Sequence, residues 1–318
     1  MSTVDQAQRL LASGQTRDAL VLLERAAEQG DAASWLELGL LFLAGRHVDR
    51  DLAKARECVS RAAQAGDPTA RNIHLQFLAL GVGGDANWAE AVDLLRDLAE
   101  GDAVAAAQTA LFDEMQLSAK GDPRGNSGGR QLSADPEVWA FDGFFSPSEC
   151  RYLIECARPR LQPSTVVDPQ RGQLLPNPVR TSHGMAFPWV SEDLVIQALN
   201  RRIAWASGTQ AAAGEPLQVL RYEPGQQYRP HFDAYDDTNN QRVFTMLVYL
   251  NEDYEGGQTV FTYNGLTFRG HTGEGLLFRN ATQSGARDGH AQHAGLPVRS
   301  GAKWLASRWI RQRPLVPV

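Results

Sequence analysis

The sequence predicts an α+β protein in two parts, with an N-terminal α-solenoid of helical repeats followed by an antiparallel β-sandwich or small barrel. Residues before 120 are rich in Ala and Leu at helical spacing, whereas later stretches are aromatic and β-branched and are separated by turn residues. A Gly-Asp pair also recurs at Gly30, Gly66 and Gly101, at intervals of 36 and 35 residues. A period in this range is typical of stacked helix pairs.

A polar segment rich in Gly, Ser and Pro separates the two parts, and it predicts a linker. We therefore expect a helical repeat domain over residues 1–118, a linker over 119–135 and a second domain over 136–318.

Each Gly-Asp pair fits a junction between two helices, because glycine can end a helix in the left-handed conformation and aspartate can cap the next helix. In the first full unit an apolar stripe and a set of small residues favour close helix packing; these are Trp35, Leu38, Leu41 and Phe42, and Ala53, Ala55 and Val59. The pattern over roughly residues 14–117 resembles Sel-type, tetratricopeptide-like repeats. An ordinary helical bundle is the alternative. Such repeats bind a protein partner or dock on a neighbouring domain, and the sequence leaves both alternatives open.

The second part opens with a helix start, since Ser146, Pro147 and Glu149 supply an N-cap, a proline at N1 and the acid of a capping box. Short strands separated by turn residues follow from residue 217. The segment VFTMLVYL (243–250) is almost continuously apolar, as expected of a central strand that is buried on both faces.

Bulk composition excludes several function classes. The chain has 318 residues, 43% of them hydrophobic, and a formal net charge of −6, which argues against a nucleic-acid partner. The three cysteines have no C-x-x-C spacing, so we expect no disulfide framework and a cytoplasmic location. We find neither a secretory signal pattern nor an apolar run of membrane-spanning length, and so expect no membrane partner.

The string RYEPGQQYRPHFDAYDD (221–237) contains the first chemical constellation, His231-Phe232-Asp233. Residues two apart on an extended segment point to the same side, so both His231 and Asp233 can face one interior. One imidazole and one carboxylate are two thirds of the facial triad of non-haem Fe(II) oxygenases. A lone H-x-D pattern is common by chance, and a third ligand is needed to support it.

A second string, QHAGLPVRSGAKWLASRWIRQR (292–313), places His293 at the start of a strand and Lys303 on the next strand. Alternation puts Lys303, Leu305, Ser307 and Trp309 on one face. A lysine inside a barrel is costly unless it meets an anion, which a small dicarboxylate would supply. The alternative for Lys303 is a surface lysine whose stem alone is buried.

Two other histidines, His271 and His290, compete with His293 for the third ligand position. His290 lies in the Gly-rich stretch GARDGHAQH, and His271 follows a glycine at a strand end. We favour His293 because it directly precedes the AGLPV strand and stands in fixed relation to the lysine strand.

Residues 137–313 resemble the collagen-type prolyl 4-hydroxylase branch of the 2-oxoglutarate/Fe(II)-dependent dioxygenases. The matching pieces recur in the family's order, and they are FDGFFSPSEC, VRTSHGMAF, QQYRPHFDAYDD, QRVFTMLVYLNEDYEGGQTVF and HAGLPVRSGAKWLASRWI. The resemblance implies a double-stranded β-helix, or jelly-roll, core. It also implies hydroxylation of a peptidyl residue, above all proline, that depends on 2-oxoglutarate and O₂ and proceeds by a ferryl intermediate.

The resemblance carries roles to individual residues. It assigns His231, Asp233 and His293 to Fe(II), and Lys303 to the distal carboxylate of 2-oxoglutarate. It also implies ascorbate as a further cofactor. Tyr222 and Thr259 match positions that help to hold the cosubstrate, whereas Tyr228, Arg242 and Trp309 match positions near the peptide substrate. Tyr222, Thr259 and Trp309 are also compatible with core packing, and Arg242 with a surface position.

The segment 163–184, rich in Pro, Gly and Gln, matches a mobile loop of the family and is a candidate lid. The loop before His293 carries an extra histidine and two arginines, which makes the target less certain than the cofactor chemistry. Two alternatives therefore stand beside peptidyl-proline hydroxylation. One is the same chemistry on another amino acid or a small molecule, and the other is a repeat-based adaptor with an inactive oxygenase half.

Overall fold

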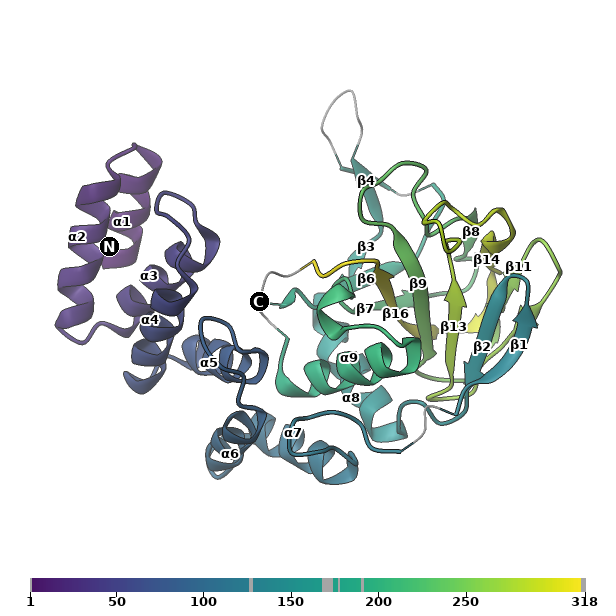
Figure 1. Cartoon of the computed structure of the whole chain (residues 1–318), viewed down its shortest axis with the longest axis horizontal. Coiled ribbons are helices and arrows are strands. Elements are labelled where there is room, and N and C mark those ends of the chain that lie inside the picture. Colours follow the sequence, from purple (N-terminus) through teal and green to yellow (C-terminus); the bar gives the residue numbers. More distant parts are fainter. Residues whose placement is uncertain (1, 126–127, 168–173, 177, 190–191, 316–318) are drawn as a thin grey trace. The chain divides into compact units, whose positions relative to one another are not determined.

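The computed structural model describes residues 2–125, 128–167, 174–176, 178–189 and 192–315, and the chain forms two compact units (Figure 1). The first consists mainly of residues up to Asp122, and the second mainly of the described residues from Pro123 onward. No helix among the described residues combines the length and apolar character that a membrane span needs.

The first unit is a chain of stacked helices. Its helices are α1 (Thr3–Ala12), α2 (Thr16–Glu28), α3 (Ala32–Ala44), α4 (Leu52–Gln64), α5 (Pro68–Leu80), α6 (Trp88–Ala99) and α7 (Ala103–Glu114). Each helix packs chiefly on the helix before it and the helix after it, as a solenoid requires. This arrangement confirms the predicted α-solenoid.

The predicted glycine caps hold at two of the three repeats. Gly30 and Gly66 have φ values of 94° and 96°, in the left-handed region. Gly101 does not adopt a positive φ, and Glu100, the C-cap of α6, stays right-handed. The third junction therefore lacks the left-handed turn that ends the other two.

The aspartates cap the following helices as predicted, with one variation. The carboxylates of Asp67 and Asp102 accept hydrogen bonds from backbone N–H groups in the first turns of α5 and α7. Asp31 is the N-cap of α3, but its carboxylate accepts a hydrogen bond from the Ser34 hydroxyl instead of a backbone group.

Close packing between α3 and α4 depends on small residues. A Cβ atom on Gly39 would lie 2.8 Å from Cγ2 of Val59, so only glycine fits without movement. Ala55 and Val59 are buried in this contact, as predicted, whereas Ala53 is exposed and takes no part in it.

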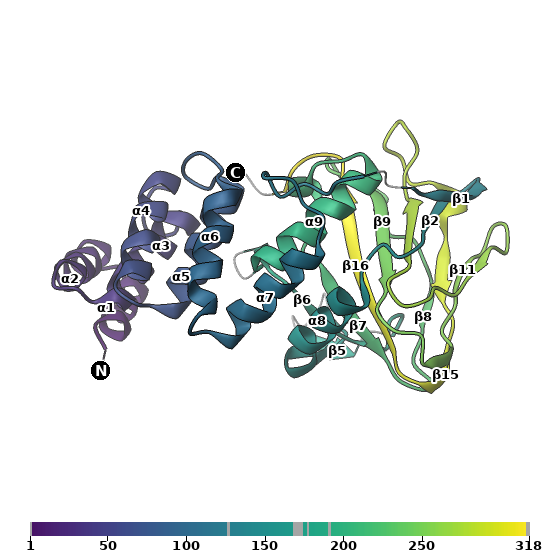
Figure 2. The same cartoon turned by 90° about the horizontal axis from the view of Figure 1, so that it is seen from below.

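The second unit is built on antiparallel sheets. Its longest sheet has the order β1-β2-β13-β9-β16-β7-β6-β3, with β9 and β16 central (Figure 2). A second sheet has the order β12-β11-β14-β8, and two short pairs are β10-β15 and β4-β5. The strands are β1 (Arg130–Ala134), β2 (Glu137–Phe141), β3 (Gln162–Pro163), β4 (Thr165–Val167), β5 (Leu174–Pro176), β6 (His183–Ala186), β7 (Gln218–Tyr222), β8 (Tyr228–His231), β9 (Arg242–Tyr249), β10 (Tyr254–Gly256), β11 (Thr259–Phe261), β12 (Thr267–Phe268), β13 (Gly275–Arg279), β14 (His293–Gly295), β15 (Val298–Gly301) and β16 (Lys303–Arg311).

The core of this unit lies between the two main sheets. Phe261 and Phe268 of the smaller sheet pack in one cluster with Tyr249, Leu276 and Phe278 of the larger sheet. β9 lies between β13 and β16 and is buried along most of its length, as its apolar sequence predicts. Two facing antiparallel sheets around one core are the predicted jelly-roll arrangement.

Helix α8 (Pro147–Ala157) begins with the predicted capping box. The Glu149 N–H donates to the Ser146 hydroxyl at 3.1 Å, and the Ser146 N–H donates to the Glu149 carboxylate at 2.8 Å. The buried Glu149 also forms a bidentate ion pair with Arg202, with N–O distances of 2.6 and 2.7 Å. This pair ties α8 to α9 (Leu194–Ser207).

Two regions of regular structure lie outside the sequence-based expectations. β1 begins at Arg130, inside the segment 119–135 expected to be a linker; it pairs with β2, and its Leu132 packs on the core cluster. α9 is a helix of 14 residues whose sequence carries a capping aspartate, since Asp193 accepts from the Ile196 N–H at 2.9 Å. The apolar run of α9 and the aspartate that caps it are the sequence features from which this helix could have been predicted.

Candidate active site

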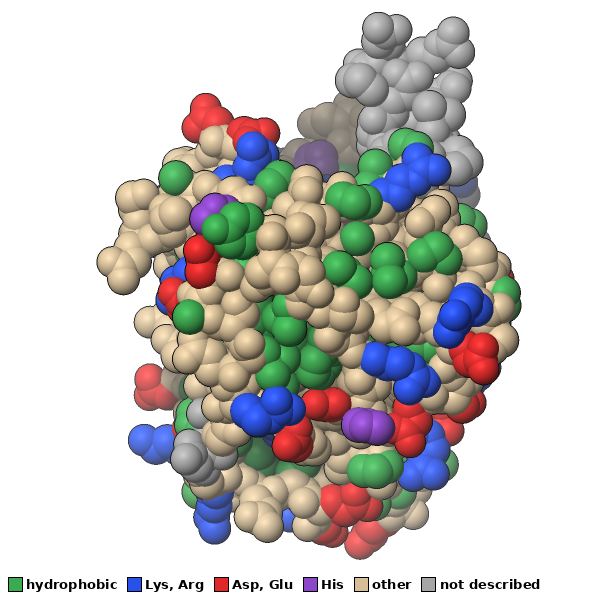
Figure 3. All heavy atoms as spheres, turned by 90° about the vertical axis from the view of Figure 1, so that its right-hand side faces the viewer, with side chains coloured by type: hydrophobic (Ala, Val, Ile, Leu, Met, Phe, Trp, Pro, Cys, Tyr) green, Lys and Arg blue, Asp and Glu red, His purple; other side chains and the backbone are tan. Residues whose placement is uncertain are grey.

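A cavity of about 520 Å³, including its open mouth, lies between the two main sheets. Its walls bring together charged, aromatic and aliphatic side chains from both sheets, namely Arg180, Leu220, Tyr222, Tyr228, His231, Asp233, Leu247, Thr259, His293, Leu296, Lys303, Leu305, Ser307 and Trp309, with Gly295. This set includes the four residues that strand alternation was expected to place on one face of β16, namely Lys303, Leu305, Ser307 and Trp309. On the face of the molecule in Figure 3, acidic and basic side chains are interspersed with exposed hydrophobic ones.

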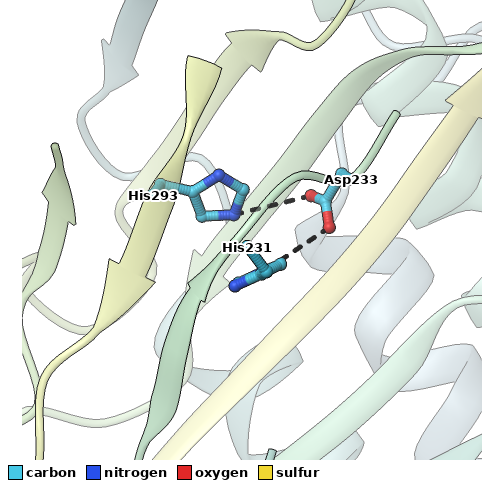
Figure 4. Close-up of side chains that lie close together, drawn as sticks. All are labelled: His231, Asp233 and His293. Atoms are coloured by element: carbon cyan, nitrogen blue, oxygen red, sulfur yellow. Dashed lines mark ion pairs between the residues drawn. The ribbon is translucent and has the colours of Figure 1, made fainter. Parts of the chain in front are cut away.

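The two histidines of the expected triad face each other across a strand pair. His231 ends β8 and His293 begins β14, and the two residues are direct partners in the antiparallel register. Asp233 follows β8, and its carboxylate faces both imidazoles from one side (Figure 4). Its oxygens are 3.5 Å from Nε2 of His231 and 3.6 Å from Nε2 of His293. The ligand atoms all lie within 4.8 Å of one another.

Backbone carbonyls orient both imidazoles. Nδ1 of His231 lies 2.8 Å from the Arg229 carbonyl oxygen, and Nδ1 of His293 lies 3.0 Å from that of Ala291. Because a carbonyl oxygen only accepts, each Nδ1 carries the proton and donates it. Each Nε2 therefore points into the triad, which is the arrangement typical of metal-binding histidines.

Burial and charge favour the metal-binding protonation states. Burial lowers the pKa of His293 to about 4, so its imidazole is neutral near pH 7. Burial alone would raise the pKa of Asp233, but His293, His231 and the Thr245 hydroxyl together hold that pKa below its ordinary value. A carboxylate and two imidazoles at one buried point fit Fe(II) in the facial-triad mode.

Lys303 is buried in the same cavity, with 3% of its surface exposed. Its ammonium donates to the Gly257 carbonyl at 2.6 Å, and burial lowers its pKa to about 7. Lys303 on β16 is the direct register partner of Tyr222 on β7, which brings both polar groups to one level of the cavity. Burial raises the pKa of Tyr222 to about 12, so the phenol keeps its proton and can donate it. The site fits an anion such as the distal carboxylate of 2-oxoglutarate.

The remaining residues expected near the cosubstrate and the peptide are also close to the cavity. Thr259 is buried, and its hydroxyl lies 2.8 Å from the Tyr249 hydroxyl. Tyr228 stacks on His231 with a centroid distance of 3.4 Å, so it forms a wall of the triad. Trp309 lines the cavity on β16.

Arg242 does not line the cavity. Its guanidinium forms a bidentate pair with Glu215, with N–O distances of 2.6 and 2.7 Å, and lies over the Trp309 ring at 3.7 Å. Arg311 pairs with the same carboxylate. Among the described residues, none accepts a hydrogen bond from Nη1 of Arg242. The N–H groups of Nη1 are therefore available to a ligand next to Trp309, which lines the cavity.

The two competing histidines lie away from the triad. His290 pairs with Asp135 at 2.9 Å and stacks on the exposed ring of Tyr263. The side chain of His271 is 80% exposed and pairs with Glu252. The preference for His293 as the third ligand is thus confirmed. The sequence feature that distinguished it from His271 and His290 was its position at the start of a strand.

Several residues of the site went unnoticed in the sequence. Arg180 lines the cavity and lies over the Tyr228 ring at 5.6 Å; it stands in the VRTSHGMAF segment, where a charged residue precedes a strand. Thr245 contacts Asp233 and Asn280 contacts Thr245, whereas Glu215 pairs with Arg242, and nothing in the local sequence marks these three residues. Within the candidate lid, 163–184, residues 168–173 and Asn177 lie outside the described residues, and β4 and β5 form an antiparallel pair.

Comparisons with known proteins agree with this geometry. The family model of the 2OG-Fe(II) oxygenase superfamily matches residues 217–311. Prolyl 4-hydroxylase 1 of Arabidopsis thaliana is 41% identical over 208 residues, which cover 59% of this chain and 74% of that protein.

Two solved structures are also similar. The viral collagen prolyl hydroxylase of Paramecium Bursaria Chlorella virus-1 is 29% identical, with a TM-score of 0.44 over 55% of this chain and 95% of its own. A Sel1 repeat protein from Oxalobacter formigenes is 25% identical, with a TM-score of 0.30 over 34% of this chain and 85% of its own.

The match to the plant enzyme covers more than two thirds of that enzyme at 41% identity, and the iron-binding residues His231, Asp233 and His293 are all present and brought together. The chain therefore belongs to the prolyl 4-hydroxylase family of the 2OG-Fe(II) oxygenases.

Proposed function

We propose that this protein hydroxylates a prolyl residue of a peptide or protein substrate, with 2-oxoglutarate and O₂ as cosubstrates. The observation that carries the proposal is the meeting of the triad and Lys303 in one cavity. His231, Asp233 and His293 hold Fe(II), which when bound supplies the redox chemistry that couples decarboxylation of 2-oxoglutarate to hydroxylation of a C–H bond.

The residues of this chain position the reactants. Two imidazoles and a carboxylate would hold the metal, and with only three protein ligands the metal could also bind the cosubstrates. Lys303 and Tyr222 offer one cation and one neutral hydroxyl donor to the distal carboxylate of 2-oxoglutarate, and Thr259 adds a second hydroxyl close by. Leu220, Leu247 and Leu305 line the same cavity and limit the access of water.

The peptide would approach at the open mouth of the cavity. Trp309 lines the cavity, and Arg242 lies directly over its ring, with guanidinium donors available to a backbone carbonyl. Aromatic rings next to an amide-recognising donor suit a proline-containing segment, which presents an apolar ring and carbonyl groups without N–H donors. These contacts support a peptide substrate over a free metabolite.

The experiment compares proline-containing peptides with matched peptides in which alanine replaces proline. Succinate release is followed alongside mass spectrometry of the peptide, with His231→Ala as the inactive control. We expect one added oxygen only on proline-containing peptides. Addition of oxygen to peptides that lack proline would contradict proline as the target, and absence of succinate with every substrate would favour the adaptor alternative.

A further inference from the structure

The carboxylate of Asp233 has a partner outside the triad. The hydroxyl of Thr245, on β9, lies 2.6 Å from Oδ2 of Asp233. Both residues are buried, with 1% and 5% of their surfaces exposed, so water does not compete for this contact. A separation this short between two oxygens requires a proton between them, and an ionised carboxylate can only accept it.

Thr245 in turn has a partner behind it. The side-chain amide of Asn280 donates to the Thr245 hydroxyl oxygen at 2.8 Å, and Asn280 is 1% exposed. A hydroxyl group has one proton, so a hydroxyl that donates to Asp233 must accept from Asn280. The direction of both hydrogen bonds is therefore fixed from Asn280 through Thr245 to Asp233.

The backbone fixes where Asn280 lies. Its N–H donates to the Val243 carbonyl at 2.9 Å, and its carbonyl accepts from the Asp288 N–H at 3.0 Å. Asn280 directly follows β13, in which Phe278 is the register partner of Thr245 on β9. The side chain of Asn280 thus reaches Thr245 from a neighbouring strand whose position does not depend on the side chain itself.

We propose that Thr245 and Asn280 are positioning residues for the iron ligand Asp233. The hydroxyl occupies one lone pair of Oδ2 and restricts rotation of the carboxylate, so that its oxygens stay directed toward His231 and His293. Asn280 fixes the Thr245 proton in the direction of Asp233. Groups that hold metal ligands in this way typically change metal affinity by about 10- to 100-fold when removed.

The test measures Co(II) binding to the metal-free protein by calorimetry, so it does not depend on the substrate proposed above. Thr245→Val keeps the shape of the side chain and removes the hydroxyl, and we expect about 10- to 100-fold weaker binding. Thr245→Ser restores the hydroxyl and should bind within about threefold of the unmodified protein. Asn280→Asp replaces the donor with an acceptor that attracts the Thr245 proton, and it should weaken binding as much as Thr245→Val.

Thr209→Val is the matched control, because its hydroxyl lies 2.8 Å from that of Ser207 and outside the cavity. It should bind Co(II) like the unmodified protein, and near-ultraviolet circular dichroism should show that every variant is folded. Equal losses for Thr245→Val and Thr245→Ser would assign the effect to packing and overturn the proposal. Unchanged binding by Asn280→Asp would overturn the role of Asn280.

The absorption bands of bound Co(II) give a second readout that a purely structural role would not move. If the carboxylate is released from its fixed orientation, the bands of the Thr245→Val and Asn280→Asp complexes should shift in the same way. Bands identical to those of the unmodified complex would contradict the positioning role even if the affinity fell.

Discussion

Replacing Lys303 by methionine would separate the electrostatic role of this side chain from its place in the core. The ammonium is buried, and its pKa falls from the ordinary 10.5 to about 7 because burial disfavours the charged form. At 1.36 kcal/mol for each pH unit, that fall corresponds to roughly 5 kcal/mol against the ammonium in the folded protein. The dicarboxylate cosubstrate would offset this cost when it binds.

Binding of 2-oxoglutarate should therefore depend strongly on Lys303. Removal of one partner from a buried ion pair costs roughly 3–5 kcal/mol, which corresponds to a loss of affinity of at least about a hundredfold. Calorimetric titration of 2-oxoglutarate into the anaerobic Fe(II) protein measures this loss. Affinity for Lys303→Met within about threefold of the unmodified protein would refute the assignment of Lys303 to the cosubstrate.

Although Lys303→Met should weaken cosubstrate binding, it should stabilise the folded protein when no cosubstrate is bound. The folded protein holds fewer protons on Lys303 than the unfolded chain between pH about 7 and 10.5, so its stability should rise with pH over that window. The free-energy cost of burying the Lys303 ammonium applies in full below pH 7, and Lys303→Met removes this cost. Thermal denaturation from pH 7 to 10 should show a pH-dependent rise in Tm that the variant lacks, and equal slopes would contradict the buried ammonium.

Three further outcomes are expected. His231→Ala should abolish Fe(II)-dependent succinate formation while the circular dichroism of the helices stays unchanged, since His231 supplies a ligand of the triad. Glu215→Gln should raise the KM for peptide about tenfold and leave the KM for 2-oxoglutarate unaltered, because it loosens the bidentate hold on Arg242; a change in both values would point to a general disturbance. Glu149→Gln should lower the free energy of unfolding by roughly 3 kcal/mol in urea denaturation, as Arg202 loses its buried partner, and a loss below about 1 kcal/mol would contradict the importance of that pair.

The sequence was most informative where chemistry and strand alternation coincide. The positions of His231 and Asp233, two apart on an extended segment, already indicated a shared direction, and the inner face of β16 followed from alternation alone. The choice of His293 over His290 rested on the position of a strand start, which the β8–β14 register bears out. Local pattern was sufficient in these cases because the functional side chains belong to regular strands or, in the case of Asp233, lie two residues after the end of one.

The sequence was less informative where function depends on contacts between distant segments. Asn280 reaches Thr245 only because β13 and β9 are neighbours, a pairing across 35 residues that no local pattern encodes. Glu215 holds Arg242 from a segment before β7, and a lone glutamate there has no distinguishing feature. The same limit explains β1, whose polar sequence indicates a linker until its pairing with β2 is known.

The direct pairing of His231 with His293 makes metal affinity a probe of folding. Because side chains alternate along a strand, a one-residue slip between β8 and β14 would turn one imidazole out of the site. A folding intermediate that has formed its helices and its larger sheet, but not this pair, would bind Co(II) weakly. Stopped-flow refolding in the presence of Co(II) would therefore time the closure of the smaller sheet independently of the rest of the chain.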